Sequence, residues 1–374
     1  MNILLLSCKT GGGHDACANA LKEQFEQMGH SAFVFDYLQL AGEKVAKRVA
    51  NTYVKTVQRA PKLFGAAYRI GMFVSKHSEH SPIYLANKKM AKYLEPYLKA
   101  HHYDAIVMTH LFPAETLTYM KRSGITLPPH IMVMTDYTCI PFLEETDCDA
   151  YIVPHPALQE ECIARGMDKE KLHPFGIPFS PKILTHLTKE EARQKLHLPL
   201  EQSVALLVGG SMGAGNLTKL VKTFSKHPHA THVQLVVICG NNQKVYRKLS
   251  KICLADSRFI LLKHTNEMPL YMKAADMIYT KPGGLTTTEA AATRIPLVHT
   301  FPIPGCENAN LTFFNTLGMS VSAPDAEGLV DVGLSLLESE VEQERMRKAQ
   351  ETNVSRKTTQ DVAEFILSMV QKSK

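Results

Sequence analysis

The feature that most constrains the fold of this 374-residue chain is an alternation of short β-branched runs with helical segments, which occurs twice along the sequence. Such alternation is typical of a parallel sheet covered by helices. Five strands are expected in the first half, at Asn2–Ser7, Ser31–Phe35, Asp104–Thr109, Ile131–Thr135 and Ala150–Val153. Five more are expected in the second half, at Val204–Val208, Gln234–Cys239, Phe259–Leu262, Met277–Tyr279 and Pro296–His299. We therefore expect an α/β protein with two doubly wound, Rossmann-like domains that face each other across a cleft.

A proline-rich segment separates the two halves. His173–Pro181 contains three prolines in nine residues, which argues against a regular element and indicates a linker between domains. We therefore place the first domain at residues 1–172 and the second at residues 182–345. This division agrees with the two domains that the length of the chain favours.

Cysteine usage and hydropathy exclude several classes of protein. The eight cysteines are scattered without a C-x-x-C pair, which indicates reduced thiols and argues against a disulfide scaffold or a zinc site. No apolar run approaches the roughly 18–20 residues that a membrane-spanning helix needs. The N-terminus also lacks the features of a secretory signal. We therefore expect a cytoplasmic chain.

A glycine-rich turn follows the first expected strand. It consists of Gly11, Gly12, Gly13 and His14, and a helix over Asp15–Met28 is expected next. Glycines let the backbone approach a ligand closely, and a helix N-terminus favours an anion or a developing negative charge. His14 is then a candidate general base for a substrate hydroxyl. A plain tight turn with a capping or packing histidine is the alternative.

Three turns in the second half are suited to a nucleotide or a sugar. Backbone amides in Gly209–Asn216 are suited to a phosphate. The segment Thr280–Ala292 combines a Pro-Gly-Gly turn with hydroxyls that suit a diphosphate and a carboxylate, Glu289, that suits a ribose diol. A capping box that starts at Thr286 is the alternative for part of this segment. The segment Pro302–Asn310 places a carboxylate beside amides, which suits the vicinal hydroxyls of a sugar.

Together these turns resemble a glycosyltransferase family. Four motifs occur in the family's order, at Gly11–His14, Gly209–Gly213, Lys281–Glu289 and Pro304–Asn310. They are similar to motifs of the monogalactosyldiacylglycerol synthase and processive diacylglycerol glucosyltransferase group, which is related to the lipid-II-forming N-acetylglucosaminyltransferase. The resemblance covers about Met1 to Asp325. It implies a GT-B fold, with transfer from a UDP-sugar and no metal or other cofactor. It also implies an acceptor site in the first domain, a UDP site in the second, and a C-terminal helix, residues 346–374, that crosses back to the first domain.

The resemblance assigns roles to individual residues. His14 matches the histidine of the first loop, and Asp136 is the rival base or the group that fixes a histidine's charge. Backbone of Leu262–Met268 is implied to bind uracil, Glu289 to bind ribose, and Glu307 with its neighbour to bind the donor sugar. The full set of implied ligand-binding residues is Gly12, Gly13, Gly210, Ser211, Gly213, His264, Thr265, Asn266, Met268, Pro282, Gly283, Gly284, Thr286, Thr287, Glu289, Glu307 and Asn308.

The chemistry of the implied reaction favours one mechanism of sugar transfer. An acceptor hydroxyl loses its proton to His14 or Asp136 while it attacks the anomeric carbon. Helix N-termini after Gly213 and Gly284 would stabilise the departing diphosphate. No carboxylate is identified as a protein nucleophile, so we expect one in-line displacement with inversion.

A basic segment stands out in the first half. Between Lys44 and His102, twelve lysine and arginine residues stand against two glutamates, although the whole chain carries a net charge of only +6. Aromatic and aliphatic residues interleave with these cations, as on surfaces that bind anionic lipid. A solvated helix face is the alternative. Nucleic acid is not expected, because no recognised binding motif accompanies the charge.

Three functions from different classes fit these observations. The favoured one is a UDP-sugar-dependent glycosyltransferase that uses a lipid acceptor, most simply diacylglycerol, at the inner face of the cell membrane. The second is a UDP-sugar enzyme with a polyprenyl-linked or soluble acceptor. The third is a non-catalytic sensor that binds a UDP-sugar without turnover.

Overall fold

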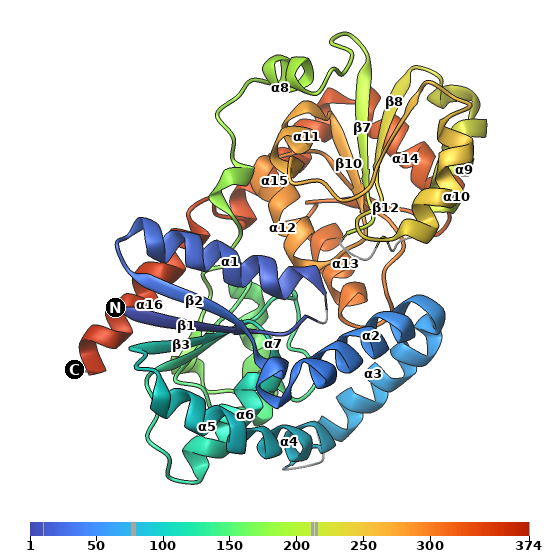
Figure 1. Ribbon diagram of the computed structural model, residues 1–374. Coiled ribbons are helices and arrows are strands. Elements are labelled where there is room, and N and C mark those ends of the chain that lie inside the picture. Colours follow the sequence, from blue (N-terminus) through green and yellow to red (C-terminus); the bar gives the residue numbers. More distant parts are fainter. Residues whose placement is uncertain (10, 76–79, 211–212, 214–215, 374) are drawn as a thin grey trace. The chain divides into compact units, whose positions relative to one another are not determined.

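The chain forms two compact units (Figure 1). The computed structural model describes residues 1–9, 11–75, 80–210, 213 and 216–373. The first unit comprises Met1–Ser180, Pro304–Cys306 and Lys357–Lys374, and the second comprises Pro181–Ile303 and Glu307–Arg356. Each unit has its own parallel six-stranded sheet, so the expected α/β class is confirmed.

The first sheet has the strand order β2-β1-β3-β4-β5-β6, and every neighbouring pair is parallel. Its strands are β1 (Asn2–Ser7), β2 (Ser31–Asp36), β3 (Ala105–Met108), β4 (His130–Val133), β5 (Ala150–Ile152) and β6 (Leu172–His173). The central strands are buried throughout, as the near-continuous apolar runs of the sequence require for a sheet covered on both faces.

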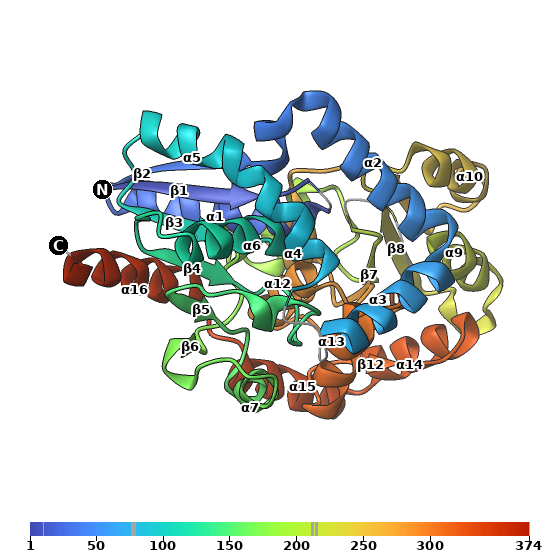
Figure 2. The ribbon, with the colours of Figure 1, turned by 90° about the horizontal axis from the view of Figure 1, so that it is seen from below.

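Helices cover both faces of this sheet. They are α1 (Gly12–Gln27), α2 (Glu43–Arg59), α3 (Pro61–Ser75), α4 (Pro82–Asn87), α5 (Ala91–Ala100), α6 (Leu111–Arg122), α7 (Gln159–Ala164) and α16 (Thr358–Ser373), with short 3-10 turns η1 (Tyr37–Ala41), η2 (Lys88–Met90), η3 (Leu143–Glu145), η4 (Pro156–Leu158) and η5 (Lys169–Lys171). Helices α1 and α16 pack side by side on one face, and α5 and α6 lie on the other (Figures 1 and 2). Helices α2 and α3 pack against each other as a hairpin.

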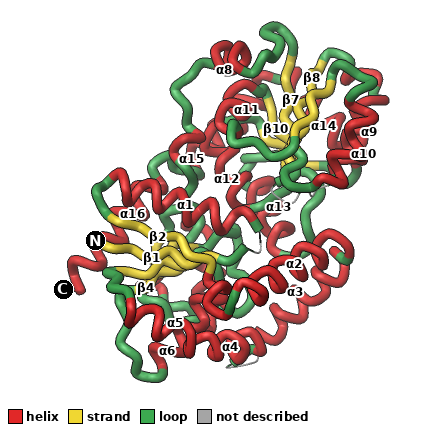
Figure 3. The backbone as a smooth tube through the Cα atoms, in the orientation of Figure 1, coloured by secondary structure: helices red, strands yellow, loops and turns green. Residues whose placement is uncertain are grey.

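The second sheet has the order β12-β11-β10-β7-β8-β9 and is also parallel throughout. Its strands β10, β7 and β8 lie side by side in Figure 3. Its strands are β7 (Ser203–Val208), β8 (Val233–Ile238), β9 (Phe259–Leu262), β10 (Met277–Thr280), β11 (Leu297–His299) and β12 (Val321–Ser322). Its other elements are α8 (Lys189–Lys195), α9 (Leu217–Lys226), α10 (Gln243–Cys253), α11 (Met268–Ala274), α12 (Gly284–Thr293), α13 (Cys306–Thr316), α14 (Ala326–Glu338), α15 (Glu340–Asn353), η6 (Pro181–Ile183) and η7 (Pro228–Ala230).

The register of this sheet brings three turns to one edge. Thr280 at the end of β10 pairs with Val208 at the end of β7 and with His299 at the end of β11. The turns that follow these three strands therefore lie next to one another, as expected for ligand sites in parallel sheets.

The ten expected strands are all present in the described residues, with ends that differ by at most two residues. Two further strands of two residues each, β6 and β12, were not predicted, because so short a run has no periodicity to detect. Helix α1 begins at Gly12 rather than Asp15 and ends at Gln27. Two glycines of the first turn are thus helical.

The proline-rich segment is not a free linker. His173 pairs in β6, and the first unit extends through Ser180 rather than ending at residue 172. The reason is a pair of hydrogen bonds to α16, in which the Phe179 amide donates to Thr359 Oγ1 (3.0 Å) and Thr359 Oγ1 donates to the Phe179 carbonyl (2.6 Å). These bonds hold the segment on the first unit.

The expected C-terminal helix over residues 346–374 is wrong as a single helix. The structure has α15, which lies in the second unit, and α16, which lies in the first. Helix α15 ends because Val354 takes an extended conformation and buries its side chain, while its carbonyl accepts a hydrogen bond from Arg294 Nη2 (2.8 Å). Only the part from Lys357 onward belongs to the first unit.

We predict that Gly333→Ala destabilises the second unit. Alanine is the better helix former by roughly 1 kcal/mol, but its methyl group at this position in α14 would lie 1.8 Å from the Tyr279 hydroxyl oxygen. Overpacking of this kind costs about 1–3 kcal/mol, which exceeds the helix gain by up to about 2 kcal/mol, so Tm should fall by up to about 8 °C. Ser335→Ala, at an exposed position of the same helix, is the control for thermal unfolding and should leave Tm unchanged or raise it. A Tm for Gly333→Ala above that of the parent protein contradicts the packing argument.

Candidate functional site

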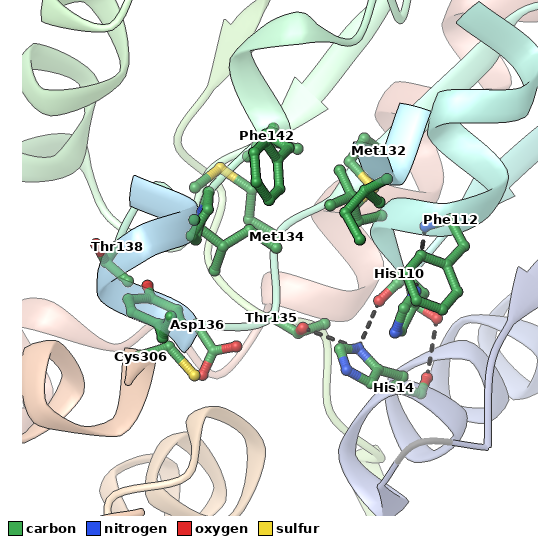
Figure 4. Close-up of a pocket in the computed structure, with 18 of the residues that line it drawn as sticks. His14, His110, Phe112, Met132, Met134, Thr135, Asp136, Thr138, Phe142 and Cys306 are labelled. Carbon is green, nitrogen blue, oxygen red and sulfur yellow. Dashed lines mark hydrogen bonds between the residues drawn. The ribbon is translucent and has the colours of Figure 1, made fainter. Parts of the chain in front are cut away.

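His14 is held at the start of α1 by two strand ends of the first sheet. Its Nδ1 lies 2.6 Å from the Thr109 carbonyl oxygen, just after β3, and 3.0 Å from Thr135 Oγ1, just after β4 (Figure 4). A carbonyl only accepts hydrogen bonds, so Nδ1 carries a proton, and in the neutral ring Nε2 has the lone pair. Within the described residues Nε2 has no hydrogen-bond partner. His14 therefore has the tautomer that a general base needs.

The alternative interpretation of His14 as a capping residue is wrong. Gly11 is the N-cap of α1, and no side chain caps this helix end. His14 lines a cavity instead, together with Thr109, Thr135 and Asp136. The described partners of Nδ1, Thr109 and Thr135, determine which nitrogen of this ring carries the proton. Figure 4 shows Asp136 and His14 on either side of Thr135 at the same end of the cavity.

His110 is a neighbour of His14 that the sequence analysis missed. The two rings meet edge to face, with centroids 4.7 Å apart. His110 Nδ1 accepts a hydrogen bond from the Phe112 amide (3.2 Å), and burial, with the charge of His14 second, holds the pKa of His110 well below its usual range. His110 is therefore a neutral wall of the site. His110 directly follows the expected strand over Asp104–Thr109. Because ligands bind beyond the carboxyl ends of parallel strands, this position could have predicted it as a site residue.

The cavity beside His14 has a volume of about 330 Å³ and is mostly apolar. Its polar lining residues are His14, Thr109, His110, Thr135, Asp136, Thr138 and Cys306. Helix α3 supplies one wall through Phe64, Ala67, Tyr68 and Gly71. The remaining walls are apolar residues of β4 and of the segment that follows it, such as Met132, Met134, Ile140 and Phe142. A base at one end of an apolar cavity suits a hydroxyl carried by an apolar molecule.

In the second unit, the turn after β7 requires glycine at Gly213. Its φ is +57°, and a Cβ there would lie 2.4 Å from the Cys239 carbonyl oxygen and 2.5 Å from the Asn242 Cβ. Gly210 also has a positive φ, +64°. Ser211 lies outside the described residues. Gly213 is therefore packed closely against the turn after β8.

Helix α12 begins directly after β10, with Gly283 as its N-cap and no side-chain cap. The alternative of a capping box from Thr286 is thus wrong, because Thr286 already lies inside the first turn. The Thr287 side chain is fully buried and lies 3.2 Å from His299 Nε2, so it supports the turn from the core. The first amides of α12 have no carbonyl in their own helix to donate to, and they form an anion-binding terminus beside the Pro282–Gly284 turn.

Glu289 lies one turn into α12 and is half-buried. The described residues give it no hydrogen-bond partner, and desolvation by burial raises the pKa of its carboxyl group to about 7. An unpartnered carboxyl group next to this helix terminus is suited to accept hydrogen bonds from a diol.

Lys281 is a cation at this edge that the sequence analysis quoted without a role. Its ammonium group pairs with Glu307, and both side chains are almost buried. A Cβ at Gly283 would lie 2.8 Å from Lys281 Nζ, and one at Gly210 would lie 3.3 Å from Lys281 Cε. Lys281 therefore brings a positive charge to both glycine turns.

The pair expected to bind the donor sugar lies in the first turn of α13. Glu307 accepts hydrogen bonds from Lys281 and from the Ile303 amide (2.7 Å). Asn308 is exposed, whereas the buried Asn310 donates to the Pro282 carbonyl (2.9 Å) and braces the turn. Asn310 is thus a further residue of the site that sequence reasoning missed.

The residues expected to bind uracil follow β9 at the edge of the same sheet. His264 and Asn266 are exposed, and Thr265 Oγ1 accepts a hydrogen bond from the Glu267 amide (3.0 Å). Met268 is the first residue of α11. These residues form a turn at the carboxyl edge of the sheet, but two strands away from β7.

Comparisons with known proteins agree with this architecture. Residues 14–179 match the family described as monogalactosyldiacylglycerol (MGDG) synthase, and residues 188–353 match glycosyl transferases group 1. A curated relative, the processive diacylglycerol beta-glucosyltransferase of Bacillus licheniformis, is 25% identical over 93% of this chain and 89% of its own. The crystal structure of Acinetobacter baumannii MurG superimposes with a TM-score of 0.62 at 15% identity, over 98% of this chain and 99% of the other. The S. aureus MnaA-UDP co-structure also gives a TM-score of 0.62, at 13% identity over 99% and 96% of the two chains.

The two parallel sheets, with glycine turns and helix starts at their strand ends, have the GT-B fold. With a match to the monogalactosyldiacylglycerol synthase family in its first half and to group 1 glycosyl transferases in its second, the chain is a hexosyltransferase. In the described part of the chain, no helix is both long and apolar enough to cross a bilayer. The same residues contain no cluster of three or more His, Cys, Asp or Glu side chains placed to hold a metal ion.

Proposed function

We propose that this hexosyltransferase moves a sugar from a UDP-sugar to the free hydroxyl of a lipid, most simply diacylglycerol, with inversion at the anomeric carbon. The observation that carries the proposal is the cavity of the first unit, which joins a base of defined tautomer to apolar walls. A diacylglycerol has that combination of one hydroxyl and apolar chains. The name of the Bacillus licheniformis relative supports the same acceptor.

The donor is assigned to the turns of the second unit. The first amides of α12 and the ammonium group of Lys281 suit a diphosphate, and Glu289 suits the ribose hydroxyls. The co-structure of S. aureus MnaA with UDP supports a UDP group in this fold. We further propose that Lys281 and the amides stabilise the departing diphosphate without a resident metal ion.

The proposed reaction is a single displacement. The acceptor oxygen forms a bond to the anomeric carbon as the bond from that carbon to the diphosphate oxygen breaks, and His14 Nε2 takes the hydroxyl proton. The Thr109 carbonyl, which accepts from Nδ1, stabilises the imidazolium that forms. An α-linked donor then gives a β-linked product.

The α2–α3 hairpin is the proposed membrane-binding surface, and the proposed location of the protein is the cytoplasmic face of an anionic membrane. Helix α2 exposes Lys47, Arg48 and Lys55. Helix α3 exposes three large apolar side chains, Leu63 (64%), Ile70 (64%) and Phe73 (65%). Cations beside exposed apolar groups are the combination that binds anionic lipid surfaces.

We predict that His14→Ala lowers kcat for transfer to diacylglycerol by about 10²–10⁴-fold, because general base catalysis is lost. KM for the donor should change little. The measurement is mass spectrometry of glycolipid formed from UDP-glucose, UDP-galactose or UDP-N-acetylglucosamine. The matched control is His102→Ala, which removes an exposed histidine of the same unit.

Three further measurements test the metal requirement, the identity of the base and the acceptor. EDTA should leave the rate unchanged, and a loss of activity that Mg²⁺ restores contradicts transfer without a metal. Full activity of His14→Ala with loss in Asp136→Asn assigns the base to Asp136. Transfer only to polyprenyl-linked or soluble acceptors contradicts the diacylglycerol proposal, and UDP-sugar binding without transfer to any acceptor identifies a sensor.

We predict that the affinity for a UDP-sugar rises with pH through about 7. The carboxyl group of Glu289, whose pKa is raised to about 7, must lose its proton to accept from two ribose hydroxyls. At one pH unit below that pKa, Glu289 is ionised in only about a tenth of the molecules. The affinity at pH 6 should therefore be about tenfold weaker than at pH 8. Calorimetry with the UDP-sugar measures Kd at the two pH values. Glu289→Gln should bind weakly at both values, and a pH dependence that persists in this variant refutes the assignment.

We predict that the triple change Lys47→Glu, Arg48→Glu and Lys55→Glu weakens binding to phosphatidylglycerol vesicles at least tenfold, because each cation contributes about 1 kcal/mol at such a surface. Co-sedimentation measures the bound fraction, and neutral vesicles or high salt should have the same effect as the variant. The matched control reverses three exposed lysines of α9 and α10, Lys222, Lys244 and Lys248. Equal losses in both variants would show that net charge, rather than the hairpin, controls binding.

A further inference from the structure

Phe142 has a backbone conformation that a bulky side chain seldom adopts. It stands just before η3 with φ +71° and ψ 0°, in the left-handed region. Residues in this region that are not glycine persist only where the surrounding structure holds them, and they gather at functional sites. The chain nevertheless has phenylalanine here, and its side chain lines the cavity that contains His14.

A buried polar cluster holds this backbone in place. The Phe142 amide donates to Ser75 Oγ (2.7 Å), and Ser75 Oγ donates to Glu144 Oε1 (2.5 Å). Arg165 completes the cluster, because its Nη2 lies 2.5 Å from Glu144 Oε1 and 3.1 Å from Ser75 Oγ. The Arg165 and Glu144 side chains are only 7% and 10% exposed. A buried ion pair thus fixes the last residue of α3 to the loop that bears Phe142.

The ring of Phe142 packs on the backbone of α3. A Cβ at Gly71 would lie 3.4 Å from Phe142 Cε2 and 3.5 Å from Phe142 Cζ, so the ring lies within van der Waals distance of this position. Pro141 packs beside it, with its own Cβ also 3.5 Å from that point. The ring is therefore enclosed between α3 and its own loop.

Phe142 and His14 occupy opposite ends of the cavity. Figure 4 shows the two residues separated across the view, with Met132 and Met134 along the space between them. One end is therefore polar, with the base and Asp136, and the other is closed by an aromatic ring. A molecule whose hydroxyl lies at His14 extends its apolar part towards Phe142.

We propose that Phe142 sets the longest acyl chain that the acceptor site takes, and that Ser75, Glu144 and Arg165 position it for this purpose. The inference rests on the proposed function, because it concerns the lipid acceptor of the same site. Phe142 is a specificity-determining residue, and the three polar residues are positioning residues. The ion pair holds the backbone of Phe142, and the ring lies against α3, so we expect a sharp limit when a longer chain enters.

The test compares kcat/KM for diacylglycerols of increasing acyl length, from eight to eighteen carbons, with one UDP-sugar. For the parent protein we expect a steep fall beyond one length. Phe142→Ala should move that limit to longer chains and raise the ratio of long-chain to short-chain kcat/KM at least about tenfold, since a single methylene group in an apolar pocket is worth that much. Phe142→Gly should do the same, and glycine adopts φ +71° freely, so this variant does not depend on a strained backbone.

Phe112→Ala is the matched control. It also removes a phenyl ring from the lining of the cavity, but at the end that contains His14 and His110 (Figure 4). We expect a lower rate with an unchanged chain-length limit. A shift of the limit in this variant equal to that in Phe142→Ala would mean that any added volume changes the selectivity, and would overturn the role of Phe142.

The positioning residues are tested through Ser75. Ser75→Ala removes the hydrogen-bond acceptor of the Phe142 amide, so the fall in kcat/KM with chain length should become at least about threefold shallower. Ser75→Thr keeps the hydroxyl group, so it should restore the steep fall. A uniform loss at all lengths in Ser75→Ala contradicts the positioning role. An unchanged length profile in both Phe142 variants, with transfer intact, refutes the inference alone. Absence of transfer from the parent protein to every diacylglycerol removes the proposed function and the inference together.

Discussion

Parallel pairing of the strands is the constraint on which both candidate sites depend. In a parallel sheet all carboxyl ends meet at one edge, so turns far apart in sequence become neighbours. In the first unit this edge brings Thr109 and Thr135 to His14. Their hydrogen bonds to Nδ1 determine which nitrogen of the ring carries the proton. In the second unit the register of Val208, Thr280 and His299 does the same for the glycine turns.

Buried charge is used differently in the two units. At the second sheet, Lys281 and Glu307 neutralise each other beside the glycine turns, so the turns carry a cation without an isolated buried charge. In the first unit, Arg165 and Glu144 are equally buried but lie behind the cavity wall, where they fix a loop. The same kind of pair thus holds an ammonium group beside one site and a loop beside the other. In both cases the partners come from separate segments, so the pair also ties those segments together.

Helix α3 connects the proposed acceptor site to the proposed membrane surface. One side of the helix lines the cavity through Phe64, Tyr68 and Gly71, while the other exposes Leu63 and Ile70. A helix that is apolar on both sides, with its cations mainly on the neighbouring α2, has one apolar side left for a partner outside the protein. Such a helix suits the proposed lipid acceptor, which would leave a bilayer to enter the cavity.

The sequence by itself determined the two parallel sheets, the turns that carry the candidate residues and the place of His14. The sequence determined these features because buried strands are encoded as local apolar runs and because a turn such as that at Gly213 admits only glycine. Only the tertiary structure decided the tautomer of His14, the roles of His110, Lys281 and Asn310, and the break between α15 and α16. Each of these depends on a contact between residues remote in the chain, such as His14 with Thr109 or Arg294 with Val354. No local pattern encodes such contacts, since they form only when separate segments pack together.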